Sequence, residues 1–195
     1  MSTLSAPEMT LAMEVGFDAT VVATIRGHGE SLSRLQTFAR DDYRPIAGPG
    51  LLLTTKPGQG ESTLRSLRAD LEHTPYQAWI HEDGFGSGPD EIAILKSRDP
   101  HVYLDVVPVN GTNYGIDHDQ VIAKYREWES RLGLKLIGAG GDWLSAEITR
   151  APADWDEFAK EVYAFCPDIV DQGTGDLPSL SREMRESKQL FLWWD

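Results

Sequence analysis

Carboxylates, tryptophans and the single cysteine gather in three short stretches of the second half of this chain. Carboxylate oxygens can transfer protons or bind cations, indole rings can stack on a ligand or anchor a partner, and a thiolate can act as a nucleophile. Together these residue types predict a binding surface or a pocket. The candidate binding residues are Asp142, Trp143, Cys166, Asp168, Asp171, Gln172, Trp193, Trp194 and Asp195.

Cys166 stands at the end of a predicted helix, directly before Pro167. The dipole at a helix C-terminus raises the pKa of a thiol, whereas a nucleophilic cysteine needs a lowered one. The five histidines are scattered and include no pair spaced four residues apart. A Cys–His pair could still assemble through space, but we expect a small buried thiol and name no catalytic residue.

Asp195 carries two carboxylates, its side chain and the end of the chain, within a few ångströms of each other. Two like charges so close need a cation, a helix N-terminus or water to stay ionised. The terminus could anchor a metal ion or a basic residue of a partner. It could equally be clamped by one of the chain's own arginines.

A metal site built from Asp142, Asp168 and Asp171 would suit Mg²⁺ or Ca²⁺, which prefer oxygen ligands. The Asp-x-x-Asp spacing is too common to be specific, so we expect no metal ion and no cofactor.

Residues 57–60 (PGQG) follow a predicted strand and open a helix, a setting that suits an anion. They lack the Lys and Ser/Thr order of a phosphate-binding loop, and Glu61 would repel a phosphate.

In the first half of the chain, short strands alternate with helices. The pattern predicts strands over 19–25, 51–55, 76–81 and 91–96, with a turn-rich break over 45–50 and a glycine-rich loop over 83–90. Leu32, Leu35 and Phe38 recur at helical spacing and predict a helix, as do Leu64, Leu67 and Leu71.

In the second half, predicted strands over 101–107, 134–137, 143–148 and 190–194 combine with three helices. Asp117 with Gln120 and Asp154 with Glu157 predict capping boxes for the first two helices. The last helix carries Leu177, Leu180 and Met184. The order β-α-β-β-α-(α)-β is the split βαβ pattern of ferredoxin-like sheets.

The fold class predicted is therefore α+β, with a ferredoxin-like C-terminal half whose sheet is extended by additional N-terminal strands and helices. Residues 1–98 form a variable N-terminal part and residues 99–195 a C-terminal α+β domain. Because no long Ser/Pro/Gly linker separates the two parts, we expect one continuous structural unit.

The composition bounds the class of protein. The chain has 195 residues, 41% of them hydrophobic and 25% charged, and one cysteine, which excludes an internal disulfide and fits a reducing cytoplasm. No apolar run approaches the roughly 20 residues of a membrane span, and the N-terminus lacks the basic region of a signal peptide. We expect a cytoplasmic protein that does not bind membranes; the sequence does not indicate its oligomeric state.

The chain is strongly acidic, with 18 basic and 31 acidic residues and a net charge of −13. This balance argues against a nucleic-acid partner, because neutralising phosphates needs clustered Lys and Arg. Seven acids and only Lys160 as a base lie within 154–176, which predicts attraction of cationic partners. The alternative is a solvated face that only aids solubility. The seven acids are Asp154, Asp156, Glu157, Glu161, Asp168, Asp171 and Asp176.

Four segments of the second half resemble the bacterial family known only as domain of unknown function 4253. They are NGTNYG over 110–115, GDW over 141–143, YAFCPDIVDQG over 163–173 and LWWD over 192–195, the last two being the most specific. The resemblance covers about the last hundred residues. It implies a bacterial intracellular protein, of a kind found beside toxin genes as immunity proteins are, and it implies no catalytic residue.

Two functions of different classes follow. The first is a non-enzymatic protein-binding module, an immunity-type inhibitor of a basic bacterial toxin, whose acidic surface attracts its partner. The second is a small-molecule-binding domain or an enzyme with a pocket lined by carboxylates, tryptophans and the cysteine. We expect binding rather than catalysis. A third alternative gives the terminal motifs a purely structural role and leaves function to the first half.

Overall fold

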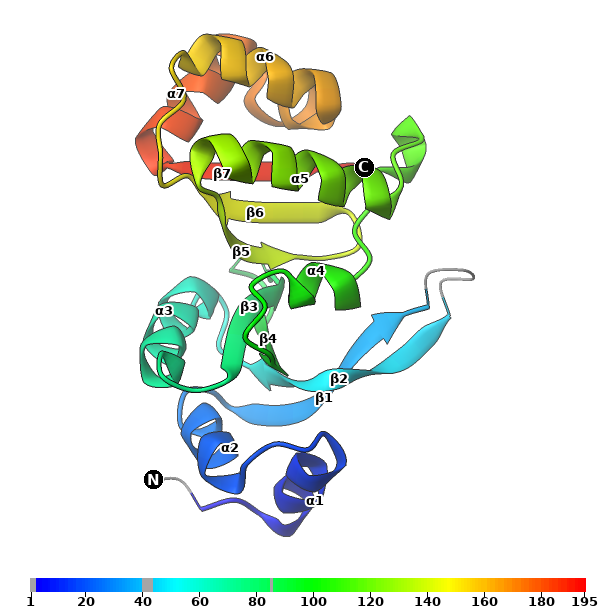
Figure 1. Cartoon of the computed structure of the whole chain (residues 1–195), viewed down its shortest axis with the longest axis vertical. Helices are drawn as coiled ribbons and strands as arrows, with labels where there is room; N and C mark the ends of the chain where they lie inside the picture. Colours follow the sequence, from blue (N-terminus) through cyan, green and yellow to red (C-terminus); the bar gives the residue numbers. More distant parts are fainter. Residues whose placement is uncertain (1–2, 40–43, 85) are drawn as a thin grey trace. The chain divides into compact units, whose positions relative to one another are not determined.

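The computed structural model describes residues 3–39, 44–84 and 86–195 (Figure 1). The chain divides into two compact units, Met1–Val107 and Pro108–Asp195, and each is described by itself. Residue 85 of the predicted glycine-rich loop lies outside the described residues. The division into 1–98 and 99–195 stays a prediction. No helix of the described residues is both long and apolar enough to cross a bilayer.

The first unit is built on four antiparallel strands in the order β1-β2-β4-β3. Helix α3 packs beside β3, as Figure 1 shows, and buries Leu64, Leu67 and Leu71 as their spacing predicts. The elements are α1 (Ala6–Glu14), α2 (Ala19–Arg26), β1 (Ser31–Phe38), β2 (Pro45–Thr54), α3 (Gly60–Leu71), β3 (Tyr76–Glu82), β4 (Glu91–Lys96) and α4 (Val102–Val106).

Four predictions in this unit are wrong at the level of element type, and three of them concern residues 19–54. The segment predicted as a strand over 19–25 is helix α2, because Asp18 caps it and Val22 and Ile25 bury one helical face. The segment carrying Leu32, Leu35 and Phe38 is strand β1, paired along its length with β2. Strand β2 also runs through the predicted break over 45–50.

The strand predicted over 101–107 is helix α4. Asp99 accepts a hydrogen bond from the His101 N–H at 2.9 Å, which turns the chain, and Tyr103 is then buried against Trp79 with stacked rings 5.0 Å apart. Without this strand, the ferredoxin-like order predicted for the C-terminal half lacks its first member. The α+β class itself is confirmed.

The N-terminus of α3 is closed by a residue that lies far from it in the sequence. Asp90 is buried, and its carboxylate accepts hydrogen bonds from the N–H of Gly60 at 2.6 Å and of Gly84 at 2.9 Å. The place at which an anion could bind to residues 57–60 thus holds the chain's own carboxylate.

The second unit contains a three-stranded antiparallel sheet in the order β5-β6-β7, in which Trp143 pairs with Trp193. The helices and strands predicted for this unit are present, whereas the short helices η1 and η2 were not predicted. The elements are η1 (Thr112–Tyr114), α5 (His118–Leu132), β5 (Lys135–Ala139), β6 (Trp143–Glu147), α6 (Trp155–Phe165), η2 (Ile169–Thr174), α7 (Leu177–Ser187) and β7 (Gln189–Trp193).

Helix caps fix the ends of these helices. Asp117 and Gln120 form the predicted capping box of α5. Asp154 caps α6 through its own side chain, whereas Glu157 contacts Lys160. Between α5 and α6 the core holds Trp128, whose ring meets Phe158 edge-on at 5.6 Å. Trp128 and Phe158 therefore belong to the core of the unit.

Candidate functional site

The carboxylate of Asp168 joins three segments that are distant in the sequence. Asp168 lies between α6 and η2 and is only 2% exposed. Its Oδ1 accepts hydrogen bonds from the Tyr114 hydroxyl at 2.5 Å and from Nε2 of Gln172 at 3.0 Å, and its Oδ2 accepts one from the N–H of Asp195 at 2.9 Å. These three donors are neutral.

The hydrogen bonds set the protonation states of this cluster. Burial by itself would raise the pKa of Asp168, but the bonds from Tyr114, Asp195 and Gln172 outweigh it and lower that pKa, so the carboxyl is ionised. The hydrogen bond to Asp168, with smaller effects of burial and neighbouring negative charge, raises the pKa of Tyr114 to about 12. A buried anion thus persists without a cation among its hydrogen-bond donors.

Main-chain contacts bring the remaining motif segments to the same place. The Trp194 N–H donates to the main-chain oxygen of Asp142 at 2.9 Å, and the Asn110 N–H donates to that of Gly141 at 2.9 Å. Gly111 lies against the Trp194 ring so closely that a Cβ there would be 2.7 Å from Cδ1. The segments 110–115, 141–143, 165–173 and 192–195 therefore meet around Asp168.

Asp195 is held by the chain itself, although by no arginine among the described residues. Its N–H donates to Asp168, and the Asn113 side chain donates to its main-chain oxygen. The side-chain carboxylates of Asp195 and Asp142 are at exposed residues, and neither contacts a basic side chain in the described part of the chain. Asp171, also exposed, accepts a hydrogen bond from the Tyr163 hydroxyl at 3.1 Å.

Cys166 is fully buried and touches the edge of strand β7. Its Sγ donates to the main-chain oxygen of Trp193 at 3.0 Å and accepts from the Trp193 N–H at 3.3 Å. Burial raises the pKa of the Cys166 thiol to about 11, so it stays protonated at neutral pH. A protonated thiol bonded to a main chain does not support a nucleophile.

The three candidate tryptophans have different environments. Trp194 is buried, meets Phe165 edge-on at 5.8 Å and donates its indole N–H to the Phe165 carbonyl. Trp143 and Trp193 are partly exposed and lie opposite each other in β6 and β7. Trp194 therefore belongs to the core, whereas the other two reach the surface.

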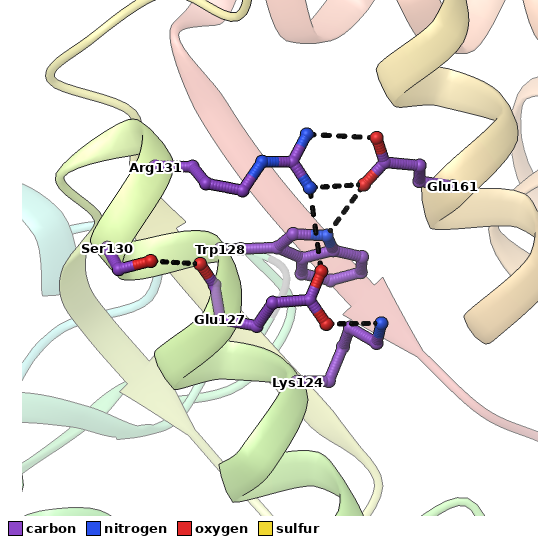
Figure 2. Close-up of polar contacts among 6 residues, drawn as sticks. All are labelled: Lys124, Glu127, Trp128, Ser130, Arg131 and Glu161. Carbon is purple, nitrogen blue, oxygen red and sulfur yellow. Dashed lines mark hydrogen bonds and ion pairs between the residues drawn. The ribbon is translucent and has the colours of Figure 1, made fainter.

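The acids of α6 contact the chain's own cations, as Figure 2 shows for Glu161. Arg131 of α5 donates two hydrogen bonds to the Glu161 carboxylate, at 2.7 and 2.9 Å, and Trp128 donates a third at 3.2 Å. These bonds from Arg131 and Trp128 lower the pKa of Glu161 despite the opposing effect of burial. Glu157 contacts Lys160 at 2.6 Å, and Asp156 lies 4.0 Å from Arg185.

Among the described residues, no group of three or more His, Cys, Asp or Glu side chains is placed to hold a metal ion. Asp168 has its nearest polar partners in Tyr114, Gln172 and a main-chain N–H, which are donors and leave little room for a cation at Oδ1. The arrangement can hold a hydrogen-bond donor or a positive charge at its rim.

The candidate residues taken from the sequence omitted Tyr114 and Asn113. Both stand in the NGTNYG segment over 110–115, one of the four segments that resemble the family. The only sign of them in the sequence is a tyrosine and an asparagine between two glycines, far in sequence from the acids that they contact. Only the folded chain shows that they bond to Asp168 and Asp195.

A known protein family matches the part of the chain that contains these segments. The family model described as Domain of unknown function (DUF4253) matches residues 91–195, more than half of the chain. The chain belongs to this family. All four DUF4253-like segments noted in the sequence lie within the matched range, and all four meet around Asp168. Searches of the curated proteins and of the solved structures found no match.

Proposed function

We propose that this DUF4253 protein is a protein-binding module that holds a basic partner at an acidic edge of the unit Pro108–Asp195. The acidic edge consists of Asp142, Asp171 and Asp195, whose chain segments meet around the buried Asp168. The observation that carries the proposal is that these three exposed carboxylates contact no basic side chain among the described residues, although contacts around Asp168 bring their chain segments together.

The rest of the acidic segment supports this choice of surface by contrast. Asp154 and Asp176 cap helices, and Asp156, Glu157 and Glu161 lie next to Arg185, Lys160 and Arg131. Such surface pairs cancel most of the field that a partner would sense. The acidic edge keeps its charge and so attracts cations, as an immunity-type inhibitor acting on a basic toxin in the cytoplasm would need.

The test is capture from a bacterial lysate by the immobilised full chain. We expect a basic protein that is retained at about 0.01 M salt and released towards about 1 M, over which the Debye length falls from about 30 Å to about 3 Å. Its retention should be lost with Asp142→Asn, Asp171→Asn and Asp195→Asn combined.

The matched control carries Glu14→Gln, Glu30→Gln and Glu72→Gln, three exposed acids of the other unit, so that the total charge is the same. This control should retain the partner. If no basic protein is captured, or if both triple variants retain it equally, the acidic edge is not the binding surface.

A second candidate is a small-molecule site at Asp168, which would use the same cluster. The observation in its favour is the π-helix η2, because π-helical turns are rare and frequent at functional sites. Here η2 places Gln172 on the carboxylate of Asp168. If Asp171→Ala and Gln172→Ala leave the stability unchanged but abolish binding of a metabolite identified by screening, this candidate replaces the first.

A further inference from the structure

The two faces of the sheet in the unit Pro108–Asp195 differ in chemistry. Successive side chains of a strand point to opposite faces. Trp194 contacts Phe165 of α6, so the face that it shares with Leu190 and Leu192 lies against the helices, and all three residues are buried. Phe191 and Trp193 point to the other face and are partly exposed.

Three aromatic rings line this second face. Trp143 lies directly opposite Trp193 across the β6–β7 pair, and its ring centroid is 6.4 Å from that of Phe191. We call Trp143, Phe191 and Trp193 the aromatic strip. From Phe191 to Trp193 the strand advances about 7 Å, at about 3.3 Å per residue, which matches an extended segment of about three residues.

No cation of the described chain lies over the aromatic strip, although other rings carry one. Lys188 sits over Trp155 with Nζ 4.8 Å from the ring centroid, and Lys124 sits over Trp128 at 5.5 Å. A partly exposed aromatic ring attracts ammonium and guanidinium groups. The strip is thus free to take a cation from outside.

The negative charge beside the aromatic strip favours a basic partner. Asp142 and Asp195 adjoin the strip in sequence, are exposed and contact no basic side chain of the described residues. A second copy of this chain would bring another net charge of −13 and be repelled. A basic segment would meet aromatic faces and carboxylates together.

We propose that the aromatic strip docks an extended, arginine-bearing segment of the basic partner; this rests on the proposed function and names its surface. A planar guanidinium stacks on an indole face while its edge still donates two parallel hydrogen bonds to a carboxylate. Lysine has a compact ammonium that cannot do both. The segment lies on the face, because Cys166 already occupies both main-chain groups of Trp193 at the outer edge of β7.

The probes are blocked octa-arginine and octa-lysine peptides, titrated into the full chain. We expect octa-arginine to bind about tenfold more tightly, through stacking that lysine does not match. In the unaltered protein, the indole N–H signals of Trp143 and Trp193 should shift in the nuclear magnetic resonance spectrum. Those of Trp128 and Trp194, bonded to Glu161 and the Phe165 carbonyl, should stay in place.

Three variants complete the test. Trp193→Leu and Phe191→Leu should each weaken octa-arginine binding severalfold and reduce its advantage over octa-lysine. Trp155→Leu is the matched control, because this ring is also partly exposed and lies among acids on α6, outside the strip; it should bind as the unaltered chain does.

The outcomes separate the two proposals. If the strip variants keep the preference for arginine while the triple variant of the acidic edge weakens both peptides, the aromatic strip is wrong and the proposed function stands. If neither set of variants changes binding, both fail. If Trp193→Leu converts a dimer into a monomer, a second copy covers the strip and the inference is overturned.

Discussion

The Cys166 thiol forms hydrogen bonds with main-chain groups at the edge of strand β7. Edge strands present unpaired main-chain groups that invite pairing with another chain. At Trp193 the thiol both donates to the carbonyl and accepts from the N–H, so that one side chain satisfies both groups. Burial keeps this thiol protonated by raising its pKa, so it can donate to the Trp193 carbonyl.

Cys166→Ala should therefore lower the free energy of unfolding by about 2 kcal/mol, because it leaves both main-chain groups of Trp193 without their partner. Cys166→Ser keeps a donor and an acceptor and should recover part of this loss. Urea denaturation of the three proteins measures both effects. Equal losses in the two variants would show that apolar packing of the sulfur, and not its hydrogen bonds, matters.

The Tyr114–Asp168 hydrogen bond predicts how stability depends on pH. The folded-state pKa of Tyr114 is about 12, above the ordinary value of about 10, so this bond stabilises the fold below about pH 10 and its contribution is lost between about pH 10 and 12. The pKa of Asp168 is lowered, so its contribution is present above about pH 4 and is lost as the pH falls through the lowered value.

Tyrosinate absorbance against pH checks the alkaline half of this prediction. Asp168→Asn should bring the pKa of Tyr114 back towards about 10, because the anion that holds its proton is gone. Tyr114→Phe identifies the titrating group by removing it. A titration of Tyr114 that is the same with Asp168 and with Asn at this position would contradict the hydrogen bond.

At the scale of elements, the residues that cap a helix have a large share in fixing where the helix lies. Asp90 shows this most clearly. It stands directly before strand β4 and not before α3, yet its carboxylate accepts the hydrogen bond from the first N–H of α3. A carboxylate at a helix N-terminus satisfies a free N–H and favours the positive end of the dipole. Residues 57–60, which lead into α3, therefore lie against a buried aspartate.

Asp90→Ala should destabilise the chain by about 2 kcal/mol, because the N–H groups of Gly60 and Gly84 lose their acceptor. Asp90→Asn keeps one acceptor oxygen and should cost less. Thermal unfolding of the variants measures the difference. Stabilisation of the unaltered protein by inorganic phosphate, abolished by neither variant, would contradict the view that Asp90 fills this position.

Two of the wrongly predicted elements show how capping, burial and strand pairing override a local preference. Residues 19–25 are rich in β-branched side chains, yet the cap at Asp18 and the burial of Val22 and Ile25 favour a helix. Leu32 and Leu35 have helical spacing, yet pairing with β2 makes them part of a strand. In both segments capping, burial or strand pairing outweighs a residue preference of a few tenths of a kcal/mol per residue.

At the scale of the whole molecule, the charge of −13 opposes folding through mutual repulsion. The ion pairs that offset it are mostly exposed, as between Lys160 and Glu157, and water and salt screen such pairs strongly. Screening should therefore relieve more repulsion than it weakens attraction.

We expect the midpoint of thermal unfolding to rise as sodium chloride increases from about 0.01 M to about 0.1 M, over which the Debye length falls from about 30 Å to about 10 Å. Chloride is used because sulfate stabilises folded proteins by a different mechanism, exclusion from their surface. Differential scanning calorimetry gives the midpoint. A falling midpoint would mean that the local ion pairs outweigh the repulsion of the excess charge.

Composition, helix caps and apolar periodicity by themselves determined the α+β class, the helices α3, α5, α6 and α7, and the acidic character, because these depend on residues near one another in the chain. The motif residues also lie in the segments that meet around Asp168. That Asp168 bonds to Tyr114 and Asp195, that Asp90 closes α3, and that Arg131 of α5 pairs with Glu161 of α6 were decided by the tertiary structure alone. Each depends on a contact between residues far apart in sequence, whose geometry exists only once the chain has folded.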